Sequence, residues 1–424
     1  MKSSKRALAA LLVLGLTAAT ACSDDDKTSD SSTVTTEGST ESTGATETTA
    51  AEVDPLGEPN AAAGETLKVG YMWSGVSAAV DNSTDLQSAQ AVTSWINEYA
   101  GGLGPDGRKL ELIDCPAPDA ATSAACGSTM VESGVSIVLF NVIGDPGPWA
   151  TTVLAAGIPI FAFSSAHASM TAAPGMAFTM TNPVAGIAYF PAKLAVNNNA
   201  KRTAVVVIDV PGATGPVNAL GPMIFEQENA GQLDIVPISP TAPDHSSAIQ
   251  VELQNNPDVV SIIGNPAFCS LTIRALRDAG YEGVIGMIGN CIDGDMLEQL
   301  SNGELKDIYV SYAGGEDPEN ADYALFVNIL AKYDDAISPH GTPAGAFVVL
   351  ESFRRFMEDY AGDYSSADLA AHIAGHAGVD QPTVDGGKLV CDGTALAIVK
   401  IACTANYVIG QLDETGTPVS FEGA

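Results

Sequence analysis

Short apolar runs alternate with amphipathic stretches through most of the chain. Several apolar residues follow one another in six segments that we predict to be strands, at residues 66–72, 135–141, 158–163, 203–210, 259–265 and 282–289. Between them, apolar positions return every three or four residues, as in 85–100, where Leu86, Val92 and Ile96 share one helical face. This alternation predicts an α/β fold in which helices cover both faces of a mostly parallel sheet.

The alternation restarts after residues 181–199, so the sequence predicts two α/β halves. A helical region at 321–335 and the helix "AGAFVVLESFRRFMEDYA" follow. The tail "GKLVCDGTALAIVKIACTANYVIGQLDETG" has an alternating pattern typical of antiparallel strands, and it contains Cys391 and Cys403. Open sheets of this kind bind ligands outside the carboxyl ends of their strands.

The first 22 residues have the features of an export signal. "MKSSKR" is basic, the apolar stretch after it is too short to span a membrane and remain there, and small residues precede Cys22. This order resembles a bacterial lipobox, with Ala19 where leucine is usual, and indicates a lipid anchor on Cys22. The alternative is an ordinary secretory signal with an incidental cysteine.

Residues 23–66 hold no aromatic and few large apolar side chains, so we expect a disordered, acidic, Ser/Thr-rich tether. The whole chain is 46% hydrophobic and carries a formal charge of −33. Such an acidic protein would repel nucleic-acid phosphates, so nucleic acid is excluded as a partner.

The cysteine count agrees with export. Six cysteines remain beside Cys22, and their spacing favours the local pairs Cys115–Cys126, Cys269–Cys291 and Cys391–Cys403. Six cysteines allow 15 connectivities, so other pairings stay open. No CxxC motif indicates zinc.

The stretch "FAFSSAHASM" raises the question of catalysis, because Ser164 and Ser165 precede His167. A serine hydrolase needs its nucleophile on a Gly-x-Ser-x-Gly elbow, and no glycine flanks these serines. We therefore expect no enzyme, and interpret the loop as a ligand contact or as a plain connection.

The other loops after predicted strands supply further candidates for ligand contacts. They are Trp73 and Ser74 in the first half, Asn141 and Gly144 after the third strand, and Thr214, Phe268, Asn290 and Asp293 in the second half. Trp73 and Phe268 can equally be core residues.

His372 and His376 stand four residues apart, a spacing that suits a metal pair. No glutamate accompanies them as in HExxH, so we expect an ordinary surface helix and no metal. No P-loop and no GxGxxG after a strand is present, and no cofactor is expected.

Several motifs together resemble the type I periplasmic-type substrate-binding proteins of ABC importers, the branch that binds leucine, isoleucine, valine or amides. They are "KVGYMWSG", "WINEYAGGLGPDGRKLELIDC", "GIPIFAFSSA", "IRALRDAGYEGVIGMIG" and "GTPAGAFVVLESFRRFMEDY". The resemblance implies two lobes, three crossovers and a ligand cleft between the lobes. It implies a first lobe of 67–183 completed by 313–380, and a second of 184–312 completed by 381–424.

By the same resemblance, the chain captures a small organic ligand and delivers it to an ABC permease. We expect a monomer on the outer face of the bacterial cell membrane. The loop "DVPGATG" lacks the tyrosine that amino-acid binders of the family use, and Ala166 or His167 stands near their threonine. An amide, an organic acid or an apolar solute is therefore as reasonable a ligand as an amino acid. The alternative function is a ligand-sensing lipoprotein that presents its closed form to a membrane receptor.

Overall fold

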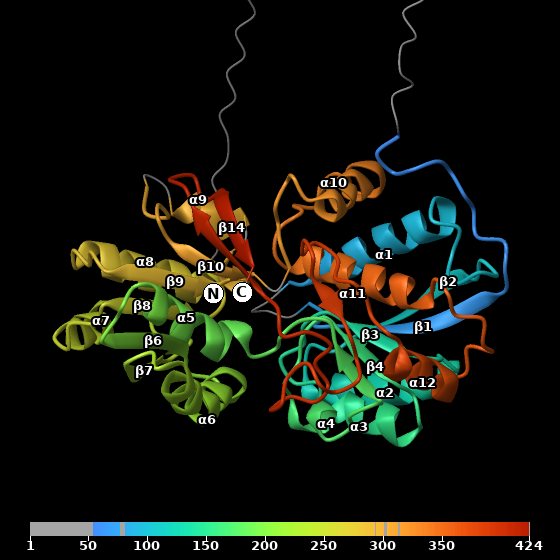
Figure 1. Ribbon diagram of the computed structural model, residues 1–424, viewed down its shortest axis with the longest axis horizontal. Coiled ribbons are helices and arrows are strands. Elements are labelled where there is room, and N and C mark those ends of the chain that lie inside the picture. The colour runs from blue at the N-terminus through green and yellow to red at the C-terminus, as the bar shows by residue number, and fades with distance from the viewer. Residues whose placement is uncertain (1–53, 77–80, 293, 301–302, 313, 424) are drawn as a thin grey trace, which may run out of the picture. The chain divides into compact units, whose positions relative to one another are not determined.

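The computed structural model describes residues 54–423 except 77–80, 293, 301–302 and 313. Contacts within Val53–Ala424 form one compact unit, separate from Met1–Glu52. Figure 1 shows the described elements in two groups, each built around its own sheet. The predicted two-lobed α/β architecture is confirmed.

The first lobe contains a five-stranded, wholly parallel sheet in the order β2-β1-β3-β4-β5. Its strands are β1 (Thr66–Trp73), β2 (Lys109–Pro116), β3 (Val138–Phe140), β4 (Ile160–Ala162) and β5 (Ala177–Thr179). Four helices belong to the core on one face: α1 (Ser83–Glu98), α10 (Ala321–Tyr333), α11 (Thr342–Met357) and α12 (Ser366–Gly375). The other face carries α2 (Ala120–Ser133), α3 (Gly147–Ala155) and α4 (Ala168–Thr171).

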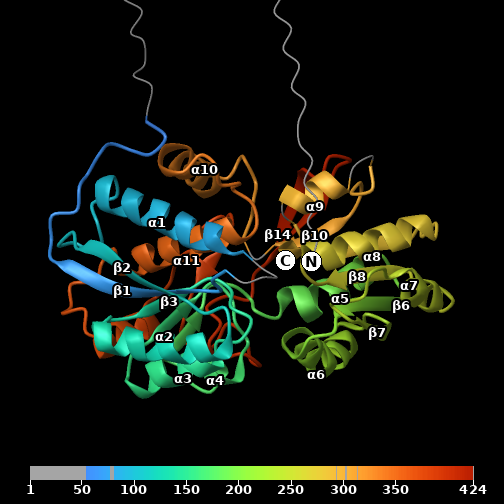
Figure 2. The same ribbon diagram turned by 180° about the vertical axis from the view of Figure 1, so that it is seen from behind.

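The period-2 alternation of β1 explains these two layers. Val69 and Tyr71 are buried in the core with α1 and α11, whereas Met72 is buried with α2 and α3. Figure 2 shows the two helical layers with β1 and β3 between them. A strand buried on both faces is typical of parallel sheets.

The second lobe contains a seven-stranded sheet in the order β14-β13-β10-β9-β8-β6-β7. Its parallel strands are β6 (Arg202–Ile208), β7 (Gln232–Ile238), β8 (Val259–Ile263), β9 (Val284–Ile288) and β10 (Tyr309–Tyr312). The antiparallel strands β13 (Val408–Leu412) and β14 (Pro418–Gly423) complete it.

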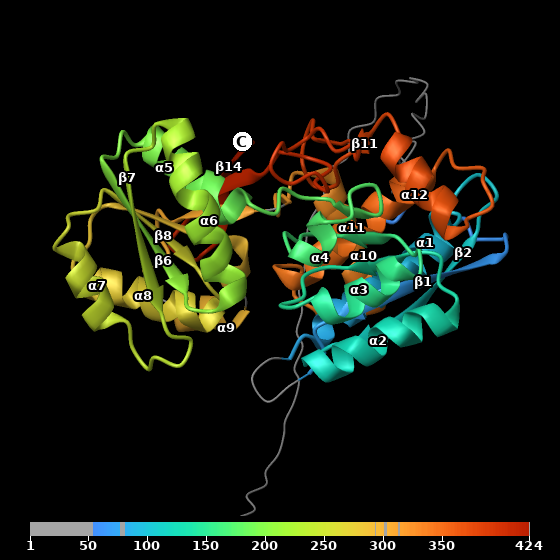
Figure 3. The same cartoon turned by 90° about the horizontal axis from the view of Figure 1, so that it is seen from below.

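Helices cover both faces of this sheet as well (Figure 3). The π-helical turn η1 (Ala185–Tyr189), α5 (Phe190–Asn197) and α6 (Pro211–Glu228) lie on one side. On the other side are α7 (Ser246–Leu253), α8 (Pro266–Asp278), the 3₁₀ turn η2 (Gly289–Cys291) and α9 (Gly294–Gln299). A small antiparallel pair, β11 (Val379–Asp380) and β12 (Lys388–Leu389), lies outside both sheets.

The described chain passes between the lobes three times. It leaves the first sheet after β5, returns after β10 to form α10 and α11, and crosses again before β13. At the last crossing, the Asn182 side-chain amide donates to the carbonyl oxygen of Ala405 over 2.9 Å, which ties the first and third connections together.

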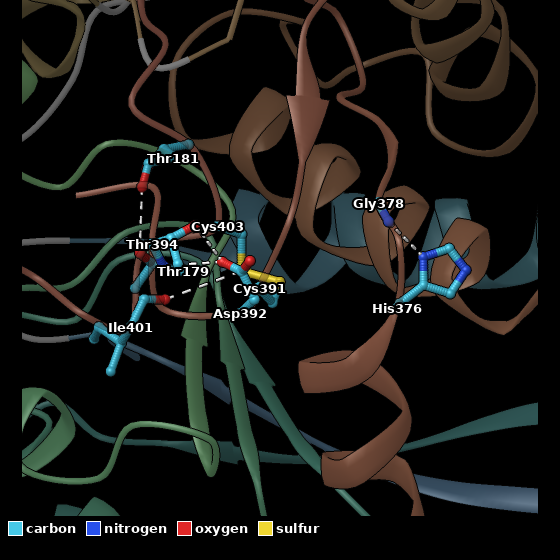
Figure 4. The surroundings of a disulfide bond; sticks show 9 residues. All are labelled: Thr179, Thr181, His376, Gly378, Cys391, Asp392, Thr394, Ile401 and Cys403. Atoms are coloured by element: carbon cyan, nitrogen blue, oxygen red, sulfur yellow. Dashed lines mark hydrogen bonds between the residues drawn. A yellow bond between two sulfur atoms is a disulfide. The ribbon is translucent and has the colours of Figure 1, made fainter. Parts of the chain in front are cut away.

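The expected antiparallel strands of the tail are confirmed at β12 and at β13, but the residues between them form a loop that packs on the first lobe, inside the range 381–424 expected to complete the second lobe. Leu389, Cys391 and Cys403 are buried in the core of the first lobe, and only residues 408–423 join the second sheet. The reason is that Ala402 pairs with Thr179 at the edge of the first sheet. Figure 4 shows this disulfide-closed loop beside Thr179.

The folded body also begins before residue 66, inside the segment expected to be a tether. Leu56 is buried in the core of the first lobe, and the indole N–H of Trp95 donates to its carbonyl oxygen over 3.1 Å. The backbone N–H of Asn60 donates to Glu98 at the end of α1. One apolar side chain and the free carbonyl groups of a helix end are enough to dock this polar segment. Cys22 and the rest of the expected tether lie outside the described residues.

All six body cysteines form disulfides in the expected local pairs: Cys115–Cys126, Cys269–Cys291 and Cys391–Cys403. Across the described ranges, no helix has the length and apolarity needed to cross a bilayer.

Candidate ligand site at the strand ends

Three neighbouring strands of the first lobe end in polar residues that contact one another. In the sheet register Met72 pairs with Phe140, and Phe140 pairs with Ala162, so the residues after these positions leave the sheet at one edge. The Ser74 hydroxyl donates to the carbonyl oxygen of Val142 over 3.2 Å. The backbone N–H of Ser164 lies 3.4 Å from the carbonyl oxygen of Asn141.

The loop Ser164–His167 is half-buried and rich in hydrogen-bonding groups. The backbone N–H of His167 donates to Ser165 Oγ over 3.2 Å, which leaves the Ser165 hydroxyl proton free to donate. Among the described residues, nothing accepts from the backbone N–H of Ser165 or Ala166. Two free N–H groups and two hydroxyls in sequence can hold the anionic or carbonyl end of a small ligand.

His167 is held by its neighbours and not by either serine of the loop. Its Nδ1 lies 2.9 Å from Ser169 Oγ, and its Nε2 lies 3.5 Å from an Asp145 carboxylate oxygen. No described contact joins its ring to Ser164 or Ser165, so the arrangement of a base against a nucleophile is missing.

Asn141 is buried at the end of β3 and holds the neighbouring loops in place through hydrogen bonds. It is 1% exposed, and its amide donates to the carbonyl oxygen of Thr342 over 2.7 Å and toward Asp85 over 3.3 Å. These bonds tie the end of β3 to the starts of α11 and α1. Asn141 therefore positions the loops and offers no free amide to a ligand.

Asp85 is a functional candidate that the sequence analysis missed. Its carboxyl is buried, accepts the Tyr71 hydroxyl over 2.8 Å, and leaves Oδ2 with no partner among the described residues. Burial raises the pKa of Asp85 to about 7, against the lowering effect of the bonds from Tyr71 and Asn141. A lone Asp in the first turn of an amphipathic helix gives no sequence signal of burial.

Trp73 is 8% exposed and belongs to the core of the first lobe, but its indole N–H has no partner among the described residues. Ser74 is half-buried at the strand end. Gly144 is exposed, with open space around its α-carbon.

The residues expected from the second lobe divide between core and surface. Phe268 is 4% exposed, packs against His245 with ring centroids 4.6 Å apart, and lies in the core, which does not support ligand stacking. Thr214 donates its hydroxyl to the carbonyl oxygen of Val210 within α6. Asn290 is exposed in η2, and Asp293 lies outside the described residues.

One contact brings the second lobe to the strand ends of the first. A Cβ placed on Gly341 would lie 3.1 Å from the carbonyl oxygen of Ile292, directly after η2. Gly341 precedes Thr342, the partner of Asn141, and its N–H donates to the buried Glu316 over 2.9 Å. The loops of both lobes thus meet at the start of α11.

Two α/β lobes, joined by three connections, meet at polar strand-end loops, and small ligands commonly bind between domains at such strand ends. The chain belongs to the periplasmic binding protein family, whose model matches residues 66–413. Members of this family bind small molecules outside the cytoplasm and work with ABC transporters. No curated protein matches the chain.

Solved structures share the fold at low identity. The branched-chain amino acid substrate-binding protein LivJ of Streptococcus pneumoniae, in complex with isoleucine, has a TM-score of 0.66 and 17% identity over 85% of this chain and 99% of its own. A substrate-binding protein from Sphaerobacter thermophilus has a TM-score of 0.70 and 13% identity over 85% and 98%. A solute-binding protein from R. palustris in complex with 4-hydroxybenzoate has 0.67 and 15% over 84% and 97%.

Proposed function

We propose that this protein is a lipid-anchored substrate-binding protein that captures a small organic solute with an anionic or carbonyl end and delivers it to an ABC permease. The observation that carries the proposal is the loop Ser164–His167. It presents two hydroxyls and two backbone N–H groups that have no acceptor in the described part of the chain, beside Ser74 and Asn141, at the strand ends where the lobes meet. Hydroxyl and backbone N–H groups are neutral hydrogen-bond donors, and such donors can bind a carboxylate or a carbonyl group.

The ligand classes to test follow from the related structures and from this chemistry. Isoleucine and 4-hydroxybenzoate, bound by two proteins of the same fold, both carry a carboxylate. Phe268, the ring expected to stack on the other end of the ligand, lies in the core of the second lobe and does not serve that role. The solute would be released when the lobes open by a hinge motion at the three connections.

The experiment is a thermal-shift screen of the chain carrying Cys22→Ser, followed by calorimetry. The screen includes branched-chain amino acids, short amides, benzoates and short-chain acids. A solute that binds the folded protein raises the Tm once its concentration exceeds the Kd. If no class shifts the Tm, solute binding is refuted.

Ser165→Ala tests the loop with the ligand found in the screen. It removes a hydroxyl donor to an anionic group, so we expect an affinity loss of roughly 10-fold or more. Thr171→Ala is the matched control, because its hydroxyl donates to Ala168 in its own short helix. Equal ligand affinities of the two variants would show that the Ser165 hydroxyl does not contact the ligand and would contradict the proposed site.

The anchor is tested separately. We expect the wild-type chain to sediment with membranes and the Cys22→Ser chain to remain in the supernatant, because the diacylglyceryl group of a lipobox cysteine inserts two acyl chains and two chains give stable anchoring. Sedimentation of both would show that Cys22 is not the anchor.

A further inference from the structure

A carboxylate and two histidines converge on the first lobe, on elements other than the strand-end loops. Asp359 follows the end of α11, His372 lies in α12, and His376 caps the end of α12. One carboxylate oxygen of Asp359 lies 3.6 Å from His372 Nε2 and 3.4 Å from His376 Nε2. The ligand atoms of all three lie within 4.8 Å of one another.

Both imidazole rings are held in place by aromatic packing. The His372 ring lies 4.6 Å from the Tyr360 ring, the His376 ring lies 5.3 Å from the Phe356 ring, and the two imidazoles are 5.2 Å apart. The histidines are therefore mostly buried, with 18% and 14% of their side chains exposed, while Asp359 is 70% exposed. The surface helix expected from the sequence has both histidines turned inward.

The separations suit a tetrahedral transition metal. With metal–nitrogen and metal–oxygen bonds of about 2.0–2.2 Å, neighbouring ligands of a zinc ion stand roughly 3.3–3.5 Å apart. Two imidazoles and a carboxylate are a donor set that favours Zn²⁺ over the hard cations Ca²⁺ and Mg²⁺. The cysteines of the body are all in disulfides, so they offer no competing thiolate.

A polar cavity of about 670 Å³ adjoins these ligands, and both Asp359 and His376 belong to its wall. Five carboxylates and three basic side chains line it. Each basic side chain pairs with one carboxylate of the wall, so Asp359 and Asp385 supply the negative charge that attracts a cation.

We propose that Asp359, His372 and His376 bind a transition-metal dication of the zinc type, with the fourth coordination position open to water or to an oxygen donor in the adjoining cavity. Binding must replace two hydrogen bonds. His372 Nε2 lies 2.6 Å from the carbonyl oxygen of Phe356, and His376 Nδ1 accepts the N–H of Gly378 over 3.0 Å (Figure 4). Both rings must change tautomer before Nε2 can coordinate, and the loss of these two hydrogen bonds lowers the affinity of the site for the metal.

Isothermal titration of the full chain carrying Cys22→Ser with ZnCl₂, after treatment with EDTA, tests the site. We expect one zinc equivalent above the background measured with CaCl₂, which reports the general attraction of an acidic surface. Asp359→Asn and His372→Asn should each weaken zinc binding by at least about tenfold, since each removes a ligand.

Glu358→Gln is the matched control, because it removes the same charge from the neighbouring residue on the same cavity wall. We expect it to bind zinc as the wild type does. An equal loss in Glu358→Gln and Asp359→Asn, or a wild-type zinc curve no different from that of CaCl₂, would overturn the site.

Folding is checked with a second readout. Zinc should raise the Tm of the wild type and of Glu358→Gln but not that of Asp359→Asn. Asp359 is largely exposed, so the last variant is expected to melt like the wild type in EDTA. A zinc-induced rise in Asp359→Asn equal to that of the wild type would also overturn the proposal.

Discussion

At the scale of single residues, the buried Asp85 links the stability of the fold to pH. Its pKa is raised to about 7 by burial, whereas a free aspartate titrates near 3.9. Between these two values the folded state holds a proton that the unfolded state has released. Stability from this residue is therefore highest below about pH 4 and decreases as pH rises toward 7.

Asp85→Asn should remove that dependence. The substitution keeps an oxygen for the Tyr71 hydroxyl, and the position of Oδ2 already lacks a partner among the described residues. We expect a gain in unfolding free energy of about 2–4 kcal/mol at pH 8 and almost none at pH 4. Urea unfolding at both pH values measures it. The exposed Asp278→Asn is the control, and an equal gain at both pH values would contradict the mechanism.

At the scale of elements, the loop closed by Cys391–Cys403 joins the edge of the first sheet to the last crossing between the lobes. The backbone N–H of Thr179 donates to Ile401, and that of Cys403 donates back to Thr179. The disulfides 391–403 and 115–126 span 12 and 11 residues, so loop closure should contribute about 3 kcal/mol for each. The two disulfides differ because only the loop closed by Cys391–Cys403 makes backbone hydrogen bonds to the sheet edge at Thr179.

Replacing both cysteines of a pair by serine should separate these roles. We expect each double variant to lose about 3 kcal/mol of unfolding free energy. Only the 391/403 variant should show faster hydrogen exchange at the N–H groups of Thr179 and of residue 403, because these two groups make the hydrogen bonds that join the loop to the sheet edge. Unchanged exchange at both positions would mean that the sheet edge holds the loop without the disulfide.

The central strands β1, β3, β4, β6, β8 and β9 were predictable because each is a local apolar run. The tail was harder, because residues 390–403 form a loop, held to the first lobe by the disulfide and by Thr179, that no local pattern indicates. The site could be predicted only in part. The position of Ser164 and Ser165 after a strand can be read from the sequence. The bond from Asn141 to Thr342 and the approach of Asp359 to His376 depend on tertiary packing, which no local sequence pattern indicates.

At the scale of the whole molecule, the N-terminal boundary of the folded body decides how the anchor that we propose at Cys22 would be connected to it. Residues from Asp54 onward lie along the first lobe, and Leu56 is inserted into the same core as Trp95 and Ile96. The backbone of Asn60 and Ala62 is bonded to the end of α1. A pull on the N-terminal segment therefore acts directly on a core helix of the first lobe.

Two truncations that differ by twelve residues test this boundary. A chain beginning at Asp54 should keep the unfolding free energy of the longer protein. A chain beginning at Thr66 should lose roughly 2–4 kcal/mol, because the Leu56 side chain and the bond from the Trp95 indole to its carbonyl oxygen are removed. Urea unfolding of both chains measures the difference.

Point variants in the chain that begins at Asp54 exclude a general effect of chain length. Leu56→Ala should cost about 2 kcal/mol, since it empties part of a core position. Glu58→Ala, at an exposed residue of the same segment, should change stability by less than about 0.5 kcal/mol. If the chain beginning at Thr66 unfolds at the same urea concentration as the one beginning at Asp54, the segment is only a linker and the force path from anchor to α1 does not exist.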